Sequence, residues 1–364
     1  MNIFFKHFEE IEDPRIKNMA TYPLNEILFL AFICILCGGV DYEDIVLIGN
    51  EQFSWFKKYF PYKNGIPSVK TFQRTFSLLD PKHLSQSFES WVKEFMNDLK
   101  GVIAIDGKTI RGSKKESSGK GAIHVLSAFA HENGLVIASQ KVDSKTNEIT
   151  AIPELLDMLS LKECIITIDA MGTQREIASK IIEKKADYVL ALKGNQGSLY
   201  DDVKTYFLDP EYAFQEFESV DSNHGRIEKR KIRVIKNIDY LNEKHKWASL
   251  KSIIQIESER TFKKTRIVEQ EKRYYISSLN TDPQMILKAI RDHWSIENTL
   301  HWSLDVTFKE DDSRVRKDHG PENLSIIRKT CFNLLKLDNT KLSLKKKMTK
   351  ALINHQYRET LLYH

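Results

Sequence analysis

The amino-acid sequence predicts an α/β fold with a mixed-sheet core and a β-rich insertion, preceded by an all-α N-terminal domain. Aliphatic strands alternate with helical segments from residue 101 to residue 213, which indicates a sheet covered by helices on both faces. Residues 1–100 carry helical patterns alone, whereas residues 214–279 are rich in β-branched and aromatic segments. We expect residues 280–340 to complete the core and residues 341–364 to form a C-terminal tail.

In the N-terminal region, proline, glycine and N-cap residues mark where helices are expected to begin and end. Pro23 suits the first position of an apolar helix, which is expected to stop at the glycine pair 38–39. Asp41 and Ser68 are each placed to cap a following helix, and a last helix is expected around residues 88–95. Residues 27–40 are strongly apolar, but this run is too short to cross a bilayer, so we interpret it as a core helix without a membrane partner.

The helix that follows Ser68 has two interpretations. Its polar face carries Lys70, Gln73 and Arg74, which could lie against DNA as a recognition helix does. The same pattern is typical of an ordinary amphipathic helix with a solvated face. The sequence does not distinguish the two interpretations.

Composition limits the class of protein. The 364 residues carry a formal net charge of +5, with 55 basic and 50 acidic residues, so any nucleic-acid surface must be local. Four cysteines do not form a disulfide framework, and Cys34 and Cys37 lie within the apolar helical run. We therefore expect buried thiols and a reducing, cytoplasmic setting.

Two expected strands end at carboxylates. An aliphatic run at 103–105 stops at Asp106, with Gly107 next, and a second run at 164–168 stops at Asp169. A turn at Asp106 and Gly107 is one explanation, but the repetition favours a site at the edge of the sheet. Between the two runs, Asn133 and Gly134 indicate a hairpin that joins strands at 124–131 and 135–142.

A third carboxylate, Glu297, lies on the expected helix after the insertion. His293, Glu297 and His301 are spaced by four residues and should share one helix face, so a transition-metal site is one interpretation. In the other, Glu297 joins Asp106 and Asp169. Three carboxylates suit Mg²⁺ or Mn²⁺, and their mutual repulsion implies a site that is fully formed only with ions bound.

Several short motifs occur together along the chain: Asp-Pro-Arg at 13–15, Tyr-Pro-Leu at 22–24, Gly-Ile-Pro-Ser at 65–68, Ala-Ile-Asp-Gly-Lys at 104–108, Ile-Asp-Ala at 168–170, Ala-Leu-Lys-Gly-Asn-Gln at 191–196, His-Gly-Arg at 224–226, and His-Trp-Ser-Ile-Glu-Asn-Thr-Leu-His-Trp at 293–302. By these motifs the chain resembles the ISAs-type insertion-sequence transposases, which include the H-repeat-associated proteins of Rhs elements. The resemblance covers nearly the whole chain.

The resemblance implies a ribonuclease-H-like core and a catalytic triad of Asp106, Asp169 and Glu297 that binds Mg²⁺, with Mn²⁺ as a substitute. The implied activity is cleavage and strand transfer of double-stranded DNA at element ends and target. It also implies a dimer on DNA and a bacterial, nucleoid-associated location. A transposition-defective DNA-binding remnant and a metal-dependent nuclease without strand transfer remain alternatives.

The chain departs from the wider transposase pattern around the last acid. Where that pattern has Tyr, Arg, Glu and Lys, this chain has Ile290, His293, Glu297 and Leu304. Phosphate contacts are therefore expected from other polar and basic residues near the motifs. The DNA-binding candidates are Lys108, Arg111, Lys193, Asn195, His224, Arg226, Arg230, His293, Trp294, Asn298, His301, Arg314 and Arg316.

Overall fold

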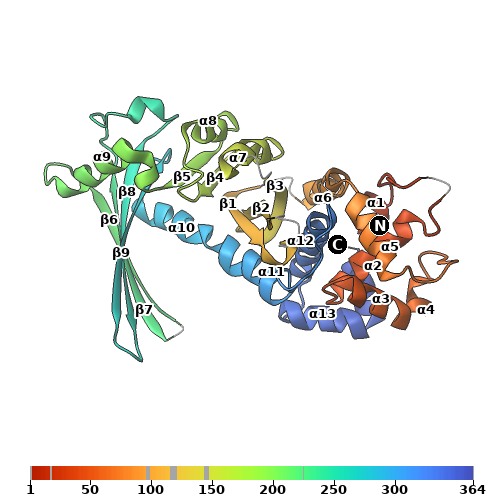
Figure 1. Cartoon of the computed structure of the whole chain (residues 1–364). Helices are drawn as coiled ribbons and strands as arrows, with labels where there is room; N and C mark the ends of the chain where they lie inside the picture. The colour runs from red at the N-terminus through yellow and green to blue at the C-terminus, as the bar shows by residue number, and fades with distance from the viewer. Residues whose placement is uncertain are drawn as a thin grey trace.

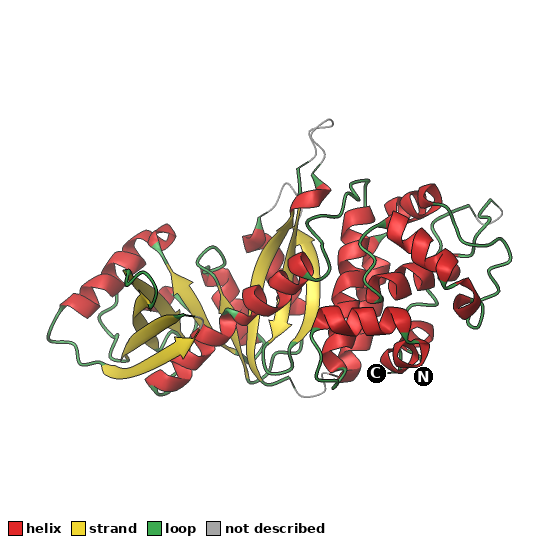
Figure 2. Ribbon diagram, turned by 90° about the horizontal axis from the view of Figure 1, so that it is seen from below, coloured by secondary structure: helices red, strands yellow, loops and turns green. Residues whose placement is uncertain are grey.

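The computed structural model describes residues 2–16, 19–95, 99–114, 121–142, 147–223 and 225–363. A region of helices alone lies at one end of the molecule, and the strands with further helices occupy the rest (Figure 1; Figure 2). The predicted mixed α/β architecture with a helical N-terminal region is confirmed. Among the described residues, no helix combines the length and the apolar content that crossing a bilayer requires.

The helical region contains both ends of the chain. Ile3 N donates to Leu362 O at 2.8 Å, so the last helix closes on the first. Its helices are α1 (Ile3–His7), α2 (Leu24–Leu36), α3 (Tyr42–Glu51), α4 (Phe53–Phe56), α5 (Val69–Leu78), α6 (Pro81–Phe95), α12 (Gly320–Leu337), α13 (Leu344–Ile353) and α14 (His355–Leu361). The segment after residue 341 is thus two packed helices, and in its basic run Lys347 is buried, donating to Leu335 O and Asp338 O.

Side-chain hydrogen bonds form the helix starts that were expected at Asp41 and Ser68. Asp41 caps α3 by accepting from Asp44 N, and Ser68 caps α5 by accepting from Thr71 N. Pro23 is the N-cap of α2 and not its first helical residue. The helix α2 is buried along nearly its whole length, as predicted for a core helix, and all four cysteines are free and buried.

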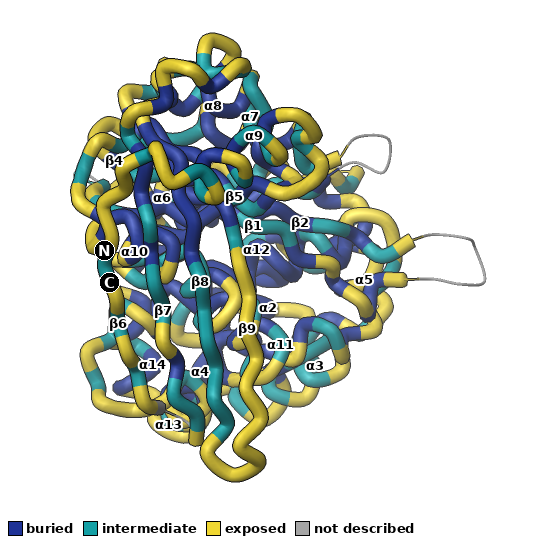
Figure 3. The backbone as a smooth tube through the Cα atoms, turned by 90° about the vertical axis from the view of Figure 1, so that its left-hand side faces the viewer, coloured by how far each residue is buried: buried dark blue, intermediate teal, exposed yellow. Residues whose placement is uncertain are grey.

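One mixed sheet of nine strands runs through the rest of the described chain in the order β3-β2-β1-β4-β5-β9-β8-β7-β6. The strands are β1 (Gly101–Ile110), β2 (Ile123–Ala130), β3 (Leu135–Val142), β4 (Cys164–Ile168), β5 (Asp187–Leu192), β6 (Gln215–Asn223), β7 (Arg226–Ile235), β8 (Ser252–Phe262) and β9 (Val268–Ser277). The predicted β-rich insertion therefore extends the core sheet, because β9 pairs with β5. Its strands become exposed toward the β8–β9 turn (Figure 3).

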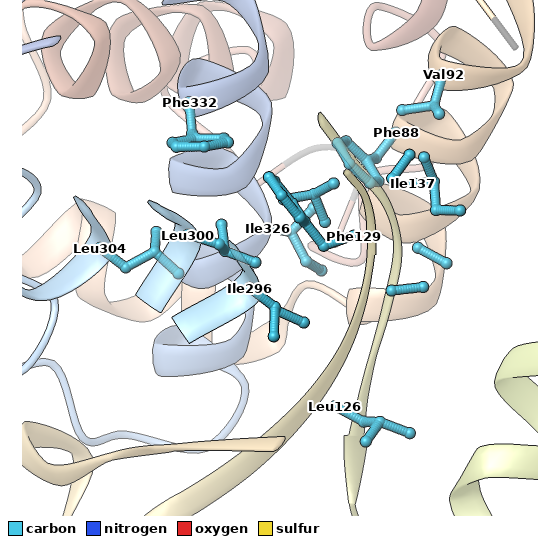
Figure 4. Close-up of a cluster of buried hydrophobic side chains, with 14 of the residues drawn as sticks. Phe88, Val92, Leu126, Phe129, Ile137, Ile296, Leu300, Leu304, Ile326 and Phe332 are labelled. Carbon is cyan, nitrogen blue, oxygen red and sulfur yellow. The ribbon is translucent and has the colours of Figure 1, made fainter. Parts of the chain in front are cut away.

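Helices cover this sheet on both sides. They are α7 (Glu148–Asp157), α8 (Arg175–Glu183), α9 (Gly197–Leu208), α10 (Pro283–His293) and α11 (Trp302–Val306). Ile286 and Ile290 of α10 pack on Ile232 and Ile254 of the insertion strands. Further along, Ile296, Leu300 and Leu304 belong to the same buried cluster as Phe129 of β2 and Ile326 of α12 (Figure 4). This cluster joins the sheet to the helical region.

Candidate active site

Asp106, Asp169 and Glu297 line one pocket of about 420 Å³. Its walls come from the ends of β4 and β5, from β9, and from the end of α10 with the residues that follow it. Lys193, His293 and Trp294, three of the predicted DNA contacts, line the same pocket. The structure thus brings together the three carboxylates that lie 63 and 128 positions apart in the sequence.

Asp106 does not end its strand, contrary to the expectation from sequence. The strand β1 continues to Ile110, and Asp106 pairs with Ser127 of β2. The strand that ends here is β4, the parallel neighbour of β1, since the pairing of β1 with β4 stops at Ile105 and Ile168. Asp106 and Asp169 are therefore the next residues on two adjacent parallel strands, which places both carboxylates at one sheet edge.

The protonation of Asp106 reflects its surroundings. Burial, together with the negative charges of Glu297, Asp169 and Glu148, raises the pKa of Asp106 from 3.8 to about 7, against a hydrogen bond from the Gly107 amide. His301 Nδ1 lies 3.5 Å from Asp106 Oδ2. Burial and the nearby Lys329 and Lys108 lower the pKa of His301 to about 3, so this imidazole is neutral at pH 7 and does not offset the carboxylate charge.

The absence of a side chain at Gly107 leaves room for a pair of side chains from neighbouring elements. His124 Nε2 lies 2.6 Å from Glu148 Oε1 beside this glycine. A Cβ at position 107 would stand 2.2 Å from His124 Nε2 and 2.5 Å from Glu148 Oε1. The turn interpretation of Gly107 is wrong, because this residue is paired with Leu126 inside β1.

Gly107→Ala is expected to destabilise the protein by about 1–3 kcal/mol, because the new methyl group must displace the His124–Glu148 pair. Thermal unfolding followed by circular dichroism would measure the change. Gly121→Ala is the matched control, since a Cβ at position 121 meets no atom within 4 Å. Equal melting temperatures for the two variants would contradict the close packing at Gly107.

Asp169 begins a loop that several hydrogen bonds fix. Its Oδ1 accepts from Met171 N at 3.0 Å and Gly172 N at 3.2 Å. Thr173 Oγ1 donates to Ala191 O at 2.6 Å, which ties the loop to the end of β5. Asn195 Nδ2 donates to Ala170 O at 2.7 Å, so this predicted DNA contact also holds the loop that carries Asp169.

Glu297 lies in a π-helical segment, Ile296–His301, between α10 and α11. The expected single α-helix with His293, Glu297 and His301 on one face is therefore interrupted. His293 Nδ1 lies 3.0 Å from Thr167 Oγ1, and burial lowers the pKa of His293 to about 4. Glu297 itself is exposed at the pocket.

Across the described ranges, no three His, Cys, Asp or Glu side chains stand close enough together to hold a metal ion as they are placed here. The His293–Glu297–His301 interpretation therefore has no preformed site to support it. The three acidic side chains share a pocket without forming a closed set of ligands.

The remaining predicted DNA contacts fall in three places. Lys108 is 9% exposed and pairs with Asp305, Glu310 and Asp311 at 2.7–3.3 Å, so three acidic side chains of this chain already surround its charge. Arg111 has an 85% exposed side chain that contacts only the rim residue Asp311 among the ion pairs described. A second pocket contains Arg226, Arg230 and Asn298.

Arg314 and Arg316 line a separate hollow of about 130 Å³ against α3 and α5, away from the carboxylate pocket. The same hollow includes Gln73 from the polar face of α5. His224 lies outside the described residues.

Sequence reasoning missed Glu148, His124, Lys272 and Arg273. Glu148 and His124 meet beside Asp106, and Lys272 and Arg273 line the carboxylate pocket from β9. Strand β9 reaches the site only because it pairs with β5. No local pattern in the sequence predicts that pairing. Lys272 and Arg273 lie in a run of charged residues, which by itself is typical of a solvent-exposed strand.

Family models identify the class of protein. A model described as DDE_Tnp_1-associated matches residues 5–92, and one described as Transposase DDE domain matches residues 97–334. The chain belongs to the transposase DDE domain family.

Within this family the chain is 41% identical to "Putative transposase YncI" of Escherichia coli O157:H7, over 97% of this chain and 92% of the relative. It is 38% identical to "H repeat-associated putative transposase YhhI" of Escherichia coli strain K12, over 98% of this chain and 97% of the relative. The predicted kinship with H-repeat-associated transposases is confirmed.

The fold is also similar to that of the piggyBac transposase solved by cryo-electron microscopy in a synaptic complex with hairpin DNA. The TM-score is 0.52 with 12% identical residues, and the match covers 99% of this chain and 80% of the other. This likeness concerns the fold alone.

Proposed function

We propose that the protein is an insertion-sequence transposase that cleaves and joins DNA strands at the ends of its element through Asp106, Asp169 and Glu297. The observation that carries the proposal is the shared pocket of these three carboxylates at the edge where β4 ends beside β1. We propose that the β1–β5 part of the sheet is a ribonuclease-H-like core. Its order, with three antiparallel strands followed by two parallel ones, supports this assignment.

The donor set fits a divalent cation. Three carboxylates and no thiolate favour Mg²⁺ or Mn²⁺. Burial and, to a smaller extent, the charges of Glu297, Asp169 and Glu148 raise the pKa of Asp106, and a bound cation would favour its ionised form. Asp106, Asp169 and Glu297 would hold the metal. When bound, such ions activate a water or a 3′-hydroxyl and stabilise the leaving oxygen of a phosphodiester.

The side chains around the carboxylates have separate roles in this proposal. Asn195 and Thr173 hold the Asp169 loop in place. Lys193, Lys272 and Arg273 line the pocket and provide positive charge for a DNA phosphate. The partner is double-stranded DNA at element ends and target, and we expect a dimer on that DNA in the bacterial cytoplasm.

Asp169→Ala tests the proposal directly. With Mg²⁺ and DNA that carries the element end, the wild-type protein should yield nicked and joined strands, and the variant should yield neither above about 0.1% of the wild-type rate. Asp201→Ala, an exposed acid on α9, is the control and should behave as wild type. Equal products from wild type and Asp169→Ala would refute the triad. Cleavage without joined products would identify a nuclease instead.

A further inference from the structure

A second pocket of about 420 Å³ adjoins the carboxylate pocket and is rich in arginine. Six residues line both pockets, among them Trp294, Glu297 and Arg273. The arginines of the second pocket are Arg226, Arg230, Arg260, Arg273 and Arg291. We call this feature the arginine pocket. Arg260, Arg273 and Arg291 were not among the residues singled out from sequence.

The arginine pocket lies on one face of the sheet, on the half of β7, β8 and β9 that is farther from the core. Residues opposite each other in antiparallel strands point to the same side, which groups Arg230 with Ser258, and Ser258 with Glu271. Closer to the core the same face carries Ile232, Ile254 and Ile256, which pack under α10. The face changes from apolar to charged where α10 ends, so its charged half is left open beside Glu297.

Glu228 organises three of the arginines. It is 8% exposed and pairs with Arg226 at 3.2 Å, with Arg260 at 2.7 Å and with Arg230. Burial would raise the pKa of Glu228, but the hydrogen bond from Arg260 and the charges of Arg230 and Arg226 lower it overall. One buried carboxylate therefore holds three guanidinium groups in place.

The other two arginines connect the pocket to the carboxylate site. The Arg273 guanidinium lies 4.9 Å from the centre of the Trp294 ring, three residues before Glu297. Arg291 pairs with Asp221 at 3.0 Å from the last turn of α10. Both arginines line the same pocket as Glu297.

The arginines retain donors for a ligand. Their carboxylate partners are Asp221, Glu228, Glu269 and Glu271. Each guanidinium offers five N–H groups in a planar fork, more than these ion pairs use. Phosphate oxygens match this fork, and a pre-arranged guanidinium loses little entropy on binding. A phosphodiester is the ligand class that suits an open set of such forks next to a phosphoryl-transfer site.

We propose that the arginine pocket binds the backbone phosphates of the same DNA strand whose scissile phosphate lies at Asp106, Asp169 and Glu297. This assignment rests on the proposed function. It provides phosphate contacts that the helical segments around Glu297 do not offer at Ile290 and Leu304, because both side chains are apolar and buried. The contacts come instead from β7, β8 and β9, with Arg291 of α10.

Arg230→Gln and Arg291→Gln are the test variants, measured by fluorescence anisotropy with a labelled duplex of about 30 base pairs between about 50 and 300 mM salt. Each should weaken binding by about tenfold at low salt and reduce the slope of log affinity against log salt by about 1. Lys229→Gln and Lys288→Gln are matched controls. Lys229 is exposed on the opposite face of β7, and Lys288 has a 61% exposed side chain on α10.

Each result decides a different question. Unchanged slopes for Arg230→Gln and Arg291→Gln, or equal losses in the lysine controls, would overturn the pocket assignment while wild-type cleavage by the triad could still stand. If the wild-type protein showed no Mg²⁺-dependent cleavage, the proposed function would be refuted, and the salt dependence of DNA binding would be unaffected. Melting temperatures identify misfolding, and Arg291→Gln keeps the test valid if Arg230→Gln unfolds, because the side chain of Arg291 is 46% exposed.

Discussion

Asp106→Asn is expected to lower Mg²⁺-dependent DNA cleavage by about 10³-fold or more and, in the same protein, to raise the stability of the metal-free fold at pH 8. The loss of activity follows from removing one proposed metal ligand, since metal ions contribute several kcal/mol to such transition states. The gain in stability follows from removing a negative charge that is partly buried beside Glu297, Asp169 and Glu148.

The direction of the pH dependence follows from the raised pKa of Asp106. Its pKa is about 7 in the folded protein and near 3.8 in the unfolded chain, so between these values the folded state binds more protons. The stability contributed by the protonated carboxyl is complete below about pH 4 and is lost as the pH rises through 7. The corresponding upper bound is about 4 kcal/mol. An amide does not titrate, so Asp106→Asn should not show this loss.

Thermal unfolding in EDTA from pH 5 to pH 9 measures this effect. Wild type should lose stability toward high pH more steeply than Asp106→Asn, and added Mn²⁺ should stabilise wild type but not the variant. Asp201→Asn serves as the control for removal of an exposed carboxylate. A variant less stable than wild type at pH 8 would show that Asp106 has a structural role and is not strained by its acidic neighbours.

Features that depend on neighbouring residues were predictable from sequence. Asn133 and Gly134 form the expected turn between β2 and β3, with Gly134 at a positive φ of 66° that a glycine adopts without strain. The caps at Asp41 and Ser68 likewise need only the side chain and the next three residues. These are short-range interactions, so a single sequence contains the information.

Features that depend on distant partners were not predictable. The continuation of β1 past Asp106 depends on pairing with β2, and the room at Gly107 is taken by His124 and Glu148. Local sequence shows a carboxylate followed by glycine, which is equally typical of a turn. Similarly, the insertion strands form part of the core sheet only because β9 pairs with β5, about 85 residues earlier in the chain.

The surroundings of Lys108 near the site were likewise not predictable from the local sequence. A cation two residues after a proposed metal ligand suggests a phosphate contact, but Asp305, Glu310 and Asp311 surround it. Only the tertiary structure brings these acids, about 200 positions away, to β1. Glu310 is the most buried of the three at 1% exposed, and it also lies 3.8 Å from Arg328, which is equally buried.

Glu310→Gln is therefore expected to destabilise the protein by about 3–5 kcal/mol, because it removes the buried negative charge that faces the buried cations Arg328 and Lys329 and takes one of three acidic partners from Lys108. Burial already lowers the pKa of Lys329 to about 8. A lysine whose folded pKa lies below its unfolded value of 10.5 destabilises the fold while it is protonated, so stability should rise with pH from about 8 to 10. Chemical denaturation at pH 7 and pH 9.5 would measure both effects.

The double variant Glu310→Gln with Lys329→Met separates charge from packing. If uncompensated charge causes the loss, removing one buried cation should recover about 1–3 kcal/mol at pH 7, and the deficit of Glu310→Gln should be smaller at pH 9.5. Asp312→Asn, with a 70% exposed side chain, should change stability by less than about 0.5 kcal/mol. A deficit that is the same at both pH values and in the double variant would assign the role of Glu310 to packing. It would also show that the cations around β1 do not depend on this carboxylate.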